Sequence, residues 1–576
     1  MFSILLFLVV AFAVIRADSR ILRHEKKTGV NEPPVPRDQL LRPRFRFPKP
    51  SFDELSRAFE IGHALSEVIY AGNGQYENGG DYPTEVRHTS CRVLGYIPAY
   101  RMLGKPIYKQ RAIEGLEYLL RVQNESSGGD FPWYHRSHRG IRNRNDGLFE
   151  TGIAGRAFVE GYKLTGDDRY LNASRRAAEW EMSCPISPNN NYNMFAVWHL
   201  AAHYELTQEQ SLLDCAIEKT RLGGMPGQFP SGGWPGHNSW IWYHGIIARG
   251  MAELLRVLPQ DHTFRSDLTA SLTAAINRAI REQTSSGEVP PNPRFKIRGH
   301  TCAFILHALL IARESMGTTL DNCIYGIMRY RLGKMSDESF VSEYAARWQE
   351  YASAREASRE AATGEIVWRA KLDRFVKDAE WGDVAVGAFN CWYPCNDLDP
   401  KHVRWQRTNS ERIGGYAQQI TSSGARLFGG MGWSIPKDVL VPGRRYRFTG
   451  WVKCSGGPDR MPLVLCSVYS GRKRPEWDPF SDCEFTRENP TYDSYSPVSV
   501  AFTAGNDVTY VYVWAMSDEI APDESVSLAV DEAYVTDDGL PLPKWDHMLE
   551  RFEGDPYMIL LPTGVYLETM FNKPSR

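Results

Sequence analysis

Apolar residues recur with a helical period over about the first two thirds of the chain, residues 51–375. In 112–120, for example, apolar side chains occupy positions i, i+3, i+4 and i+7, the spacing of one helix face. Loops rich in glycine and proline interrupt this pattern about every 50 residues, at Pro83, Pro132 and Pro235 among others. Such a period fits two helices and two loops, so it predicts about six αα-hairpins. These hairpins form either a closed double ring of helices, with the loops at one mouth, or an open solenoid.

After residue 381 the period of the hydrophobic pattern changes to two. Apolar and other side chains alternate in 446–452, 498–502, 508–514 and 526–530, and turn residues separate these stretches. Alternation of this kind predicts strands with one buried face. The chain is therefore expected to end in an antiparallel β-sandwich of about 160 residues.

Particular stretches of both halves carry a likeness to known families. In the helical half they are GGDYPTEVRHTS, LEYLLRVQNESSGGDFPWY, LTGDDRYLNASRRAAEW and NNNYNMFAVWHLAAHYELT. This half resembles the (α/α)6-toroid carbohydrate-active enzymes, which include six-hairpin glycosidases and toroid polysaccharide lyases. In the second half, GRRYRFTGWVK and LAVDEAYV resemble the jelly-roll, galactose-binding-like modules that bind carbohydrate. The resemblance implies a catalytic toroid followed by a binding module.

The N-terminal residues predict export. An unbroken apolar run, Ile4 to Ile15, suits a secretory signal peptide cleaved near Ala17, and no later stretch suits a membrane helix. The expected organisation is a signal peptide (1–17), a basic, proline-rich arm (18–50), a toroid (51–378), a sandwich (379–540) and a C-terminal extension (541–576). The arm is interpreted as a solvated linker, with binding of an acidic polymer as the alternative.

Composition and charge restrict the classes of partner. The 67 basic and 69 acidic residues nearly balance, which gives no general attraction to nucleic acid or anionic membranes. Aromatic residues make up 12% of the chain, as suits either sugar stacking or a large core. Trp392, Trp405 and Trp433 lie outside the alternating stretches and are predicted to stack on sugars, with burial as the alternative.

Ten cysteines are too few for a disulfide scaffold, but some can pair in an exported protein. Cys454 and Cys466 flank a turn between two predicted strands, so a disulfide is expected between them. Cys391 and Cys395 could clamp a loop. The spacing of paired cysteines typical of structural zinc sites is absent from the sequence.

The loops of the helical half collect the residue types that β-elimination on a uronic acid requires. The sugar carboxylate must be neutralised by donors, a base must remove the C5 proton, and an acid must protonate the departing O4. Arg87 is predicted to bind the carboxylate, because a guanidinium matches its geometry. The other candidates for substrate binding are Asn190, His135, His237, Asn238, Trp133, Trp234, Arg298 and His300.

Toroid lyases similar to alginate lyases have an Asn-Asn-His stretch in one loop and a later Tyr-His pair. Asn190-Asn191 matches the first position and Tyr243-His244 the second, so the resemblance implies catalytic roles for Asn191, Tyr243 and His244. This chain has tyrosine where the family has the histidine after the asparagine pair. The neutralising group or the base must therefore come from elsewhere, and His88, His135 and His237 are the candidates.

Hydrolysis is the alternative reaction. An inverting glycosidase needs two carboxyl groups separated by room for a water, and Asp130 with Glu150 is the candidate pair. A uronate epimerase, which shares the first step of a lyase, and a non-catalytic glycan-binding protein also remain open.

His199 and His203 have the i, i+4 spacing of a metal site, but the surrounding helix is apolar and packing is preferred. No organic cofactor is expected, and a structural calcium in the sandwich is open. We therefore predict a secreted polysaccharide lyase that acts on an anionic, uronate-containing polysaccharide.

Overall fold

The computed structural model consists of two compact units. One comprises Met1–His135, Arg144–Trp348 and Trp545–Arg576, and the other Arg136–Asn143 and Gln349–Lys544. The structure describes residues 33–76, 86–125, 128–131, 144–290, 303–334, 339–370, 372, 375–378, 382–385, 388–392, 403–409, 416–424, 427–456, 463–469, 484–488, 494–517, 521–542 and 557–571. The predicted signal peptide lies outside these residues. Within the described part of the chain, no helix combines the length and apolar character needed to cross a membrane.

The first unit is helical. Six helices contact one another in a closed inner ring, each touching the next, and the last touches the first. They are α3 (Val86–Leu103), α5 (Arg144–Thr165), α7 (Asn190–Thr207), α9 (Ile241–Val257), α11 (Ala303–Met316) and α15 (Tyr557–Phe571). The fold is thus an (α/α)6 toroid, and the predicted closed ring is confirmed.

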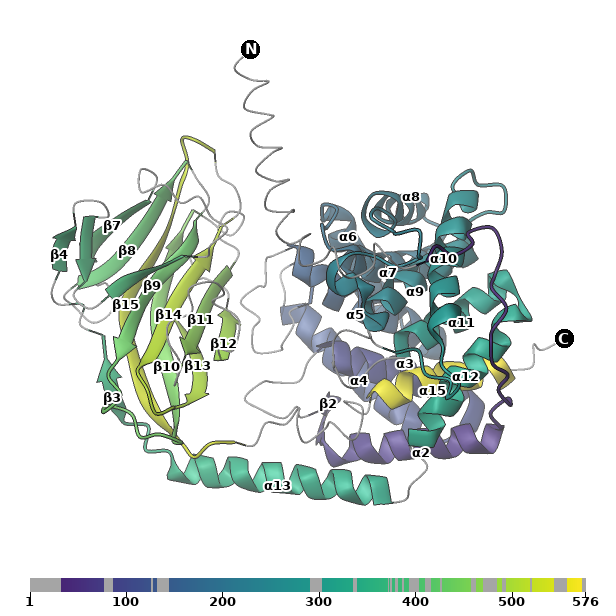
Figure 1. Cartoon of the computed structure of the whole chain (residues 1–576), viewed down its shortest axis with the longest axis horizontal. Helices are drawn as coiled ribbons and strands as arrows, with labels where there is room; N and C mark the ends of the chain where they lie inside the picture. The colour runs from purple at the N-terminus through teal and green to yellow at the C-terminus, as the bar shows by residue number, and fades with distance from the viewer. Residues whose placement is uncertain are drawn as a thin grey trace, which may run out of the picture. The chain divides into compact units, whose positions relative to one another are not determined.

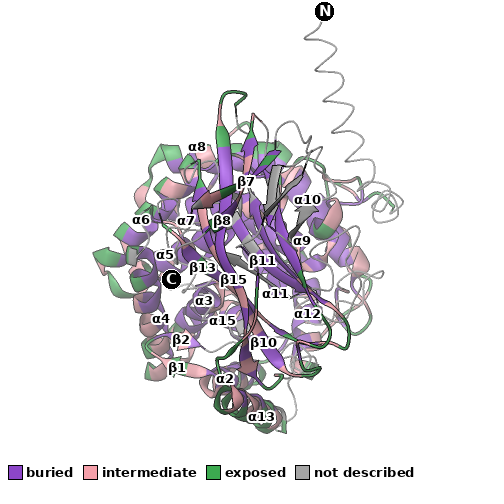
Figure 2. Ribbon diagram, turned by 90° about the vertical axis from the view of Figure 1, so that its left-hand side faces the viewer, coloured by how far each residue is buried: buried purple, intermediate pink, exposed green. Residues whose placement is uncertain are grey.

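Outer helices cover the inner ring, and each packs on an inner partner. They are α2 (Phe52–Val68), α4 (Pro106–Glu125), α6 (Asp168–Ser183), α8 (Gln210–Lys219), α10 (Arg265–Glu282) and α12 (Asp321–Lys334). Short elements in the connections are β1 (Tyr70–Gly72), β2 (Gln75–Tyr76), η2 (Thr220–Gly224), η3 (Gly236–Ser239) and η4 (Thr318–Leu320). Outer helices such as α6 and α8 expose one side to solvent (Figure 2), as their amphipathic sequences require.

The C-terminal helix α15 completes the ring. It contacts α3, α2 and α11, and Figure 1 shows it in yellow among the teal and purple helices. Its side chains Leu560, Leu561 and Leu567 are buried in the same core as the first helices of the chain. Residues 541–576 were expected as an extension after the sandwich, but this helix belongs to the toroid. The sandwich is therefore inserted between the last outer and the last inner helix.

Glycines permit the closest approaches between inner helices. A Cβ atom added to Gly564 on α15 would lie 2.3 Å from the carbonyl oxygen of Gly95 on α3. One added to Gly95 would lie 2.6 Å from the backbone of Leu560. The same holds between α5 and α7, where Gly152 faces the backbone of Phe195. Larger side chains at these positions would separate the helices and open the ring.

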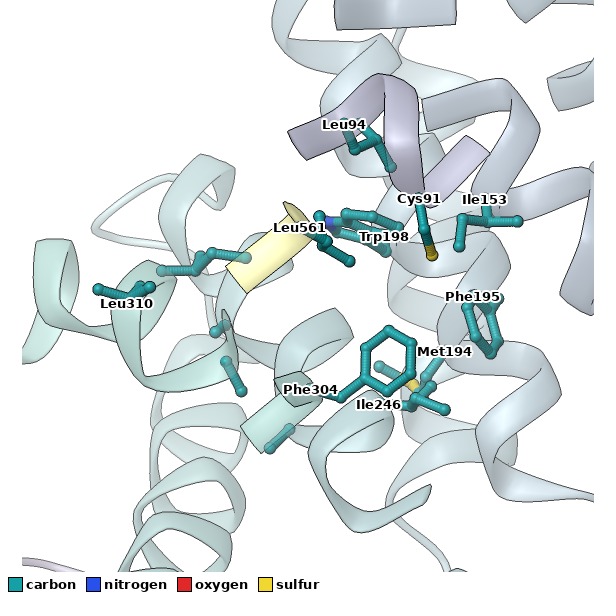
Figure 3. Close-up of a cluster of buried hydrophobic side chains, with 14 of the residues drawn as sticks. Cys91, Leu94, Ile153, Met194, Phe195, Trp198, Ile246, Phe304, Leu310 and Leu561 are labelled. Atoms are coloured by element: carbon teal, nitrogen blue, oxygen red, sulfur yellow. The ribbon is translucent and has the colours of Figure 1, made fainter. Parts of the chain in front are cut away.

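The core inside the ring combines side chains from every part of this unit. Figure 3 shows Cys91, Trp198, Phe195 and Phe304, from α3, α7 and α11, together with Leu561 of α15. All five are buried and belong to one hydrophobic core.

Residues 33–50, which we call the strap, run along the outside of the helical unit. The amide of Asn277 on α10 donates to two strap carbonyls, both at 2.8 Å, and accepts a strap N–H at 2.7 Å. On α12, Asn322 accepts another strap N–H at 2.9 Å. The expectation of a solvated linker is thus wrong for the strap, because outer-helix asparagines satisfy its backbone groups.

A buried hydrogen-bonded chain joins α6 to α7. Ser174 Oγ lies 2.8 Å from His199 Nε2 and 2.8 Å from His203 Nδ1, and His199 Nδ1 lies 2.8 Å from Glu181 Oε2. Burial lowers the pKa of both imidazoles to about 3 and raises that of Glu181 well above its usual value. The two histidines therefore take part in helix packing, as polar core residues with internal partners.

The second unit is a sandwich of two sheets, antiparallel except where β5 pairs with β7 in parallel, and the predicted alternating strands are confirmed. One sheet has the order β13-β10-β15-β8-β7-β5-β4, with β3 paired to β15, and the other has the order β12-β11-β14-β9-β6. The strands of the first sheet are β3 (Ile366–Arg369), β4 (Phe375–Asp378), β5 (Gly382–Ala385), β7 (Val403–Asn409), β8 (Tyr416–Ser423), β10 (Arg445–Ser455), β13 (Ser496–Thr503) and β15 (Ser525–Gly539). Those of the second are β6 (Ala388–Trp392), β9 (Phe428–Ile435), β11 (Leu463–Tyr469), β12 (Glu484–Glu488) and β14 (Thr509–Met516). Helix α13 (Ser339–Ala361) precedes them.

Two expectations for the sandwich are wrong. Cys454 on β10 and Cys466 on β11 are free buried thiols, and their strands belong to different sheets rather than to one hairpin. Trp405 and Trp433 are each only 2% exposed in the sandwich core, so neither can stack on a sugar. The side chain of Trp392 and the whole of Cys395 lie outside the described residues.

Replacing Gly564 with alanine is expected to lower the free energy of unfolding by about 1–3 kcal/mol, because its Cβ would meet the backbone of α3. Urea unfolding of the full chain measures this. Gly333→Ala on α12 is the matched control, since a Cβ there meets no atom within 4 Å. An equally small effect of both substitutions would contradict the close approach of α15.

Acid is expected to destabilise the helical unit. His199, His203 and His244 have pKa values of about 3 when folded, against 6.5 ordinarily. The unfolded chain therefore binds more protons between pH 6.5 and 3, and the free energy of unfolding falls as pH falls through that window. Each histidine should cost about 2 kcal/mol at pH 5. Glu181, whose pKa is raised, opposes part of this change.

Urea midpoints at pH 7 and pH 5 test the effect of acid. His244→Gln, at a position that does not contact Glu181, should reduce the difference between the two midpoints. If the wild-type midpoint were the same at both pH values, the folded chain would have to tolerate charged imidazoles at these positions.

Candidate functional site

The N-terminal ends of the inner helices gather the candidate residues at one mouth of the toroid. Each outer helix returns the chain, so the inner helices run in the same direction and begin at the same end. Arg87 lies in the first turn of α3, Glu150 in the second turn of α5, Asn191 in the first turn of α7, and Tyr243 in the first turn of α9. The topology therefore brings together four candidates that are far apart in sequence.

A network of asparagine side chains forms a buried layer of this mouth. Asn191 Nδ2 donates to Asn238 Oδ1 at 2.7 Å and to Asn189 Oδ1 at 2.8 Å, and Asn191 is fully buried. Asn190 Nδ2 donates to the carbonyl oxygens of Gly223 at 2.9 Å and of Pro226 at 3.0 Å. These amides hold the loop before α9 in place. Direct binding of a substrate carboxylate, the expected role of Asn191, does not fit its burial.

A second, accessible layer is formed by His237, Trp240 and Tyr243. The rings of His237 and Tyr243 meet edge to face with centroids 4.7 Å apart, and the Trp240 ring lies 5.8 Å from that of Tyr243. His237 is exposed and Tyr243 is half-buried. The Tyr243 hydroxyl makes no hydrogen bond to a described residue, so it can meet a ligand.

The ionisation of this pair is set by desolvation and by Arg87. Partial desolvation lowers the pKa of His237, so its imidazole is neutral at neutral pH. Burial raises the pKa of Tyr243, while the positive charge of Arg87 partly offsets that rise. Tyr243 therefore keeps its proton at neutral pH, beside a neutral imidazole and within electrostatic reach of a cation.

The Asn191 side chain lies beside the imidazole of His237. Asn191 Nδ2 lies 3.2 Å from His237 Nε2, a longer contact than its two bonds to other asparagines. Those two shorter bonds use both amide hydrogens, so the imidazole keeps a nitrogen lone pair for proton transfer.

Arg87 and Glu150 supply the opposite side of the mouth. Arg87 Nε lies 4.0 Å from Glu150 Oε1, and the guanidinium lies 5.4 Å from the centre of the Phe149 ring. The Phe149 ring lies 6.2 Å from that of Tyr192 on α7. The arrangement places a cation, a carboxylate and two aromatic rings near one another at the starts of α3, α5 and α7.

The alternative carboxylate pair is also brought into proximity. The N–H of Phe131 donates to Thr151 Oγ1 at 3.0 Å, and these are the immediate neighbours of Asp130 and Glu150. Asp130 is half-buried, whereas Glu150 is 4% exposed. The loop carrying the first carboxylate is thereby fixed to the helix carrying the second.

Two candidates do not belong to the mouth. His244 is fully buried, and its Nε2 lies 2.9 Å from the carbonyl oxygen of Ala275 on α10. Trp234 is also fully buried and packs on the His244 ring with centroids 5.3 Å apart. Both side chains therefore face the outer layer, and the expectation that they touch substrate is wrong.

His88 lies in the first turn of α3, half-buried next to Arg87 in sequence. Trp133, His135, Arg298 and His300 lie outside the described residues, as does the side chain of Asp146. In the described part of the chain, no three His, Cys, Asp or Glu side chains come together as metal ligands would.

Sequence analysis assigned no role to Phe149, Tyr192 and Trp240, although all three lie close to candidate residues. Their position in the sequence could have identified them, because each lies within two residues of a candidate polar side chain at the start of an inner helix. Aromatic residues at such positions are equally compatible with burial in the hydrophobic core.

Comparison with known proteins gives similarities of fold. No protein-family model matches this sequence, and no curated protein sequence matches it. The unsaturated glucuronyl hydrolase of Streptococcus agalactiae aligns with a TM-score of 0.39 at 12% identity, over 52% of this chain and 85% of that one. A polysaccharide lyase aligns with a TM-score of 0.34 at 14% identity, over 52% and 84%. The CBM22-1 xylan-binding domain of Paenibacillus barcinonensis Xyn10C aligns with a TM-score of 0.21 at 14% identity, over 31% and 99%. At these scores the likenesses assign no role to any residue.

Substituting Asn191 with alanine is expected to lower the free energy of unfolding by about 1–3 kcal/mol, because it leaves the buried amide oxygen of Asn238 without its donor. Hydrogen exchange should also accelerate in 236–240, the turn that the network holds. Asn172→Ala, on the exposed side of α6, is the matched control and should change neither quantity. Unchanged exchange in 236–240 would mean that the turn is held by other contacts.

Proposed function

We propose that the protein is a secreted polysaccharide lyase that cleaves a uronate-containing polysaccharide by β-elimination. The observation that carries this proposal is the pair of His237 and Tyr243, one neutral and one protonated, at the mouth and within electrostatic reach of Arg87. Such a pair provides the base and the acid that elimination requires.

In this reaction Arg87 binds the carboxylate of the uronic acid. Its positive charge makes the C5 proton more acidic, because it stabilises the negative charge that develops on the carboxylate as that proton leaves. Phe149 lies under the guanidinium and helps to orient it. Of the three histidines considered as base, His237 is the one that the described residues place beside Tyr243.

The protons balance within the pair. The imidazole of His237 takes the C5 proton, the electrons of that C–H bond form the C4–C5 double bond, and the C4–O4 bond breaks. Tyr243 gives its hydroxyl proton to O4, which leaves as the new chain end. The imidazolium then returns a proton to the tyrosinate, so the enzyme ends as it began.

Export and glycan binding complete the proposal. The apolar run Ile4 to Ile15 supports secretion, where extracellular polysaccharides are met. The sandwich is proposed to bind carbohydrate, through surfaces other than Trp405 and Trp433, which are buried.

A second candidate function is inverting hydrolysis by Asp130 and Glu150. The observation that favours it is the hydrogen bond between Phe131 and Thr151, which holds the neighbouring carboxylates at one opening. Glu150 would be the acid, because it is the more buried of the two, and Asp130 the base that activates water.

Ultraviolet absorbance of the product distinguishes the two reactions. Elimination gives a conjugated unsaturated uronate that absorbs, whereas hydrolysis gives reducing ends without absorbance. We expect absorbance to rise on one of alginate, glucuronan, pectate and glycosaminoglycans. Reducing ends without absorbance would favour the hydrolase, and conversion of sugar configuration without cleavage would indicate an epimerase.

Substitutions then test the residues. Tyr243→Phe should lower kcat/KM by about 10²–10⁴, the usual contribution of an acid or base catalyst, while Tyr204→Phe at the far end of α7 should not change it. In the wild type, activity should fall as pH falls through the lowered pKa of His237, since it depends on a neutral imidazole. His237→Gln should lower kcat/KM by a similar factor and remove this acidic limb from the residual activity. Asp130→Asn should spare a lyase and abolish a hydrolase. Full activity of Tyr243→Phe would refute the proposed acid.

A further inference from the structure

A fully buried arginine lies inside the inner ring without a hydrogen-bond partner. Arg249, on the third turn of α9, has no exposed surface, and none of its three guanidine nitrogens that donate hydrogen bonds has a partner in the described part of the chain. Buried guanidinium groups almost always have hydrogen-bond acceptors, because burying an unpaired charge carries a large desolvation cost. The arginine therefore lacks the acceptor that its position requires.

Aromatic rings hold this guanidinium by its faces. The Cζ atom of Arg249 lies 3.5 Å from the centre of the Trp198 ring, 4.8 Å from that of the Phe304 ring and 5.1 Å from that of the Phe195 ring. These three side chains point into the interior of the ring in Figure 3. Ring faces satisfy the positive charge in part, but the N–H groups lie in the guanidinium plane and point past them.

The neighbouring acid is already bound to other arginines. Glu253 Oε1 lies 2.9 Å from Arg156 and 2.9 Å from Arg256. Arg156 also pairs with Glu160 at 3.1 Å. Burial accordingly lowers the pKa of Arg249 to about 9, although that value still leaves the group charged at neutral pH.

Further donors without acceptors lie around the same group. Trp198 Nε1 and His307 Nδ1 are buried and have no hydrogen-bond partner in the described part of the chain. The rings of Trp198 and His307 meet edge to face at 5.5 Å. Burial and the charge of Arg249 both lower the pKa of His307, so it is neutral and its ring N–H can donate. The other group that faces Arg249 is the Cys91 thiol, which burial keeps protonated because its pKa is raised, so it offers no negative charge. Several buried donors without a strong acceptor describe an anion site.

We propose that the interior of the inner ring binds a small monovalent anion of the size of chloride, held by Arg249 with Trp198 and His307. A small ion is required because Arg249 has no exposed surface, which keeps a polymer from reaching it. The site is independent of the proposed reaction at the mouth, and its ligand is structural.

Bromide, which replaces chloride and scatters anomalously, tests the site directly. Crystals of the full chain grown or soaked in sodium bromide should show an anomalous peak in the plane of the Arg249 guanidinium. Peaks only at the surface would mean an adventitious ion only and would overturn the proposal. A carboxylate of a soaked uronate oligosaccharide at Arg249 would overturn it as well.

Thermal unfolding gives a second readout. At equal ionic strength, replacing gluconate in the buffer with chloride should raise the Tm of the wild type by about 3–6 °C, when the chloride concentration is 100-fold above the dissociation constant. Arg249→Met should lose this increment. Arg256→Met is the matched control on the same helix, and it should lower the Tm but retain the increment, because Arg256 binds Glu205 and Glu253.

If Arg249→Met does not fold, the bromide experiment on the wild type still shows whether an anion binds at Arg249. A chloride increment of equal size in Arg249→Met and the wild type would show that the anion acts elsewhere. A Tm that does not respond to chloride, together with no buried bromide peak, would overturn the site.

Discussion

The close packing of the inner helices is the constraint on which the rest of the molecule depends. Adjacent inner helices approach so closely that glycine is needed where they touch, as between Gly95 on α3 and Gly564 on α15. Only a closed ring buries the apolar faces of all six helices, including Leu560 and Leu561. Closure also brings the starts of the inner helices to one mouth, so the candidate site is a consequence of this packing.

The polar residues of the mouth form a buried layer and a more exposed layer. Asn191 and Asn238 satisfy one another below the surface and fix the turn before α9. His237 and Tyr243 lie above them, with groups that remain open to a ligand. In the proposed reaction, this buried layer would hold the acid and the base in position, which matters because small displacements reduce proton transfer steeply.

The hydrophobic periodicity of the sequence predicted the helices and strands well, because it reflects which side of each element is buried. It could not predict that α15 completes the ring, since the hydrophobic pattern of 557–571 does not say which helices lie beside it. Nor could it distinguish Trp405 in a core from a tryptophan at a surface, because a tryptophan outside the recognised alternating stretches suits either place. Tyr243 was identified by the resemblance of Tyr243-His244 to the Tyr-His pair of toroid lyases, but His244 next to it faces a different side of α9, as adjacent helical residues do. Arg249 gave no sequence signal, because a single arginine in an apolar helix is usually read as solvent-facing.

The position of α15 has a consequence for the order in which the protein is made. A ribosome releases the whole sandwich before it synthesises the helix that closes the toroid. Until then α3 and α11 expose the apolar faces that α15 will cover. The first eleven helices of the toroid, α2 to α12, therefore form an open, aggregation-prone intermediate until the ribosome has synthesised the sandwich and then α15. A chaperone, or the early folding of the sandwich itself, would have to protect them, and a chain terminated anywhere before residue 557 would lack the helix that completes the ring.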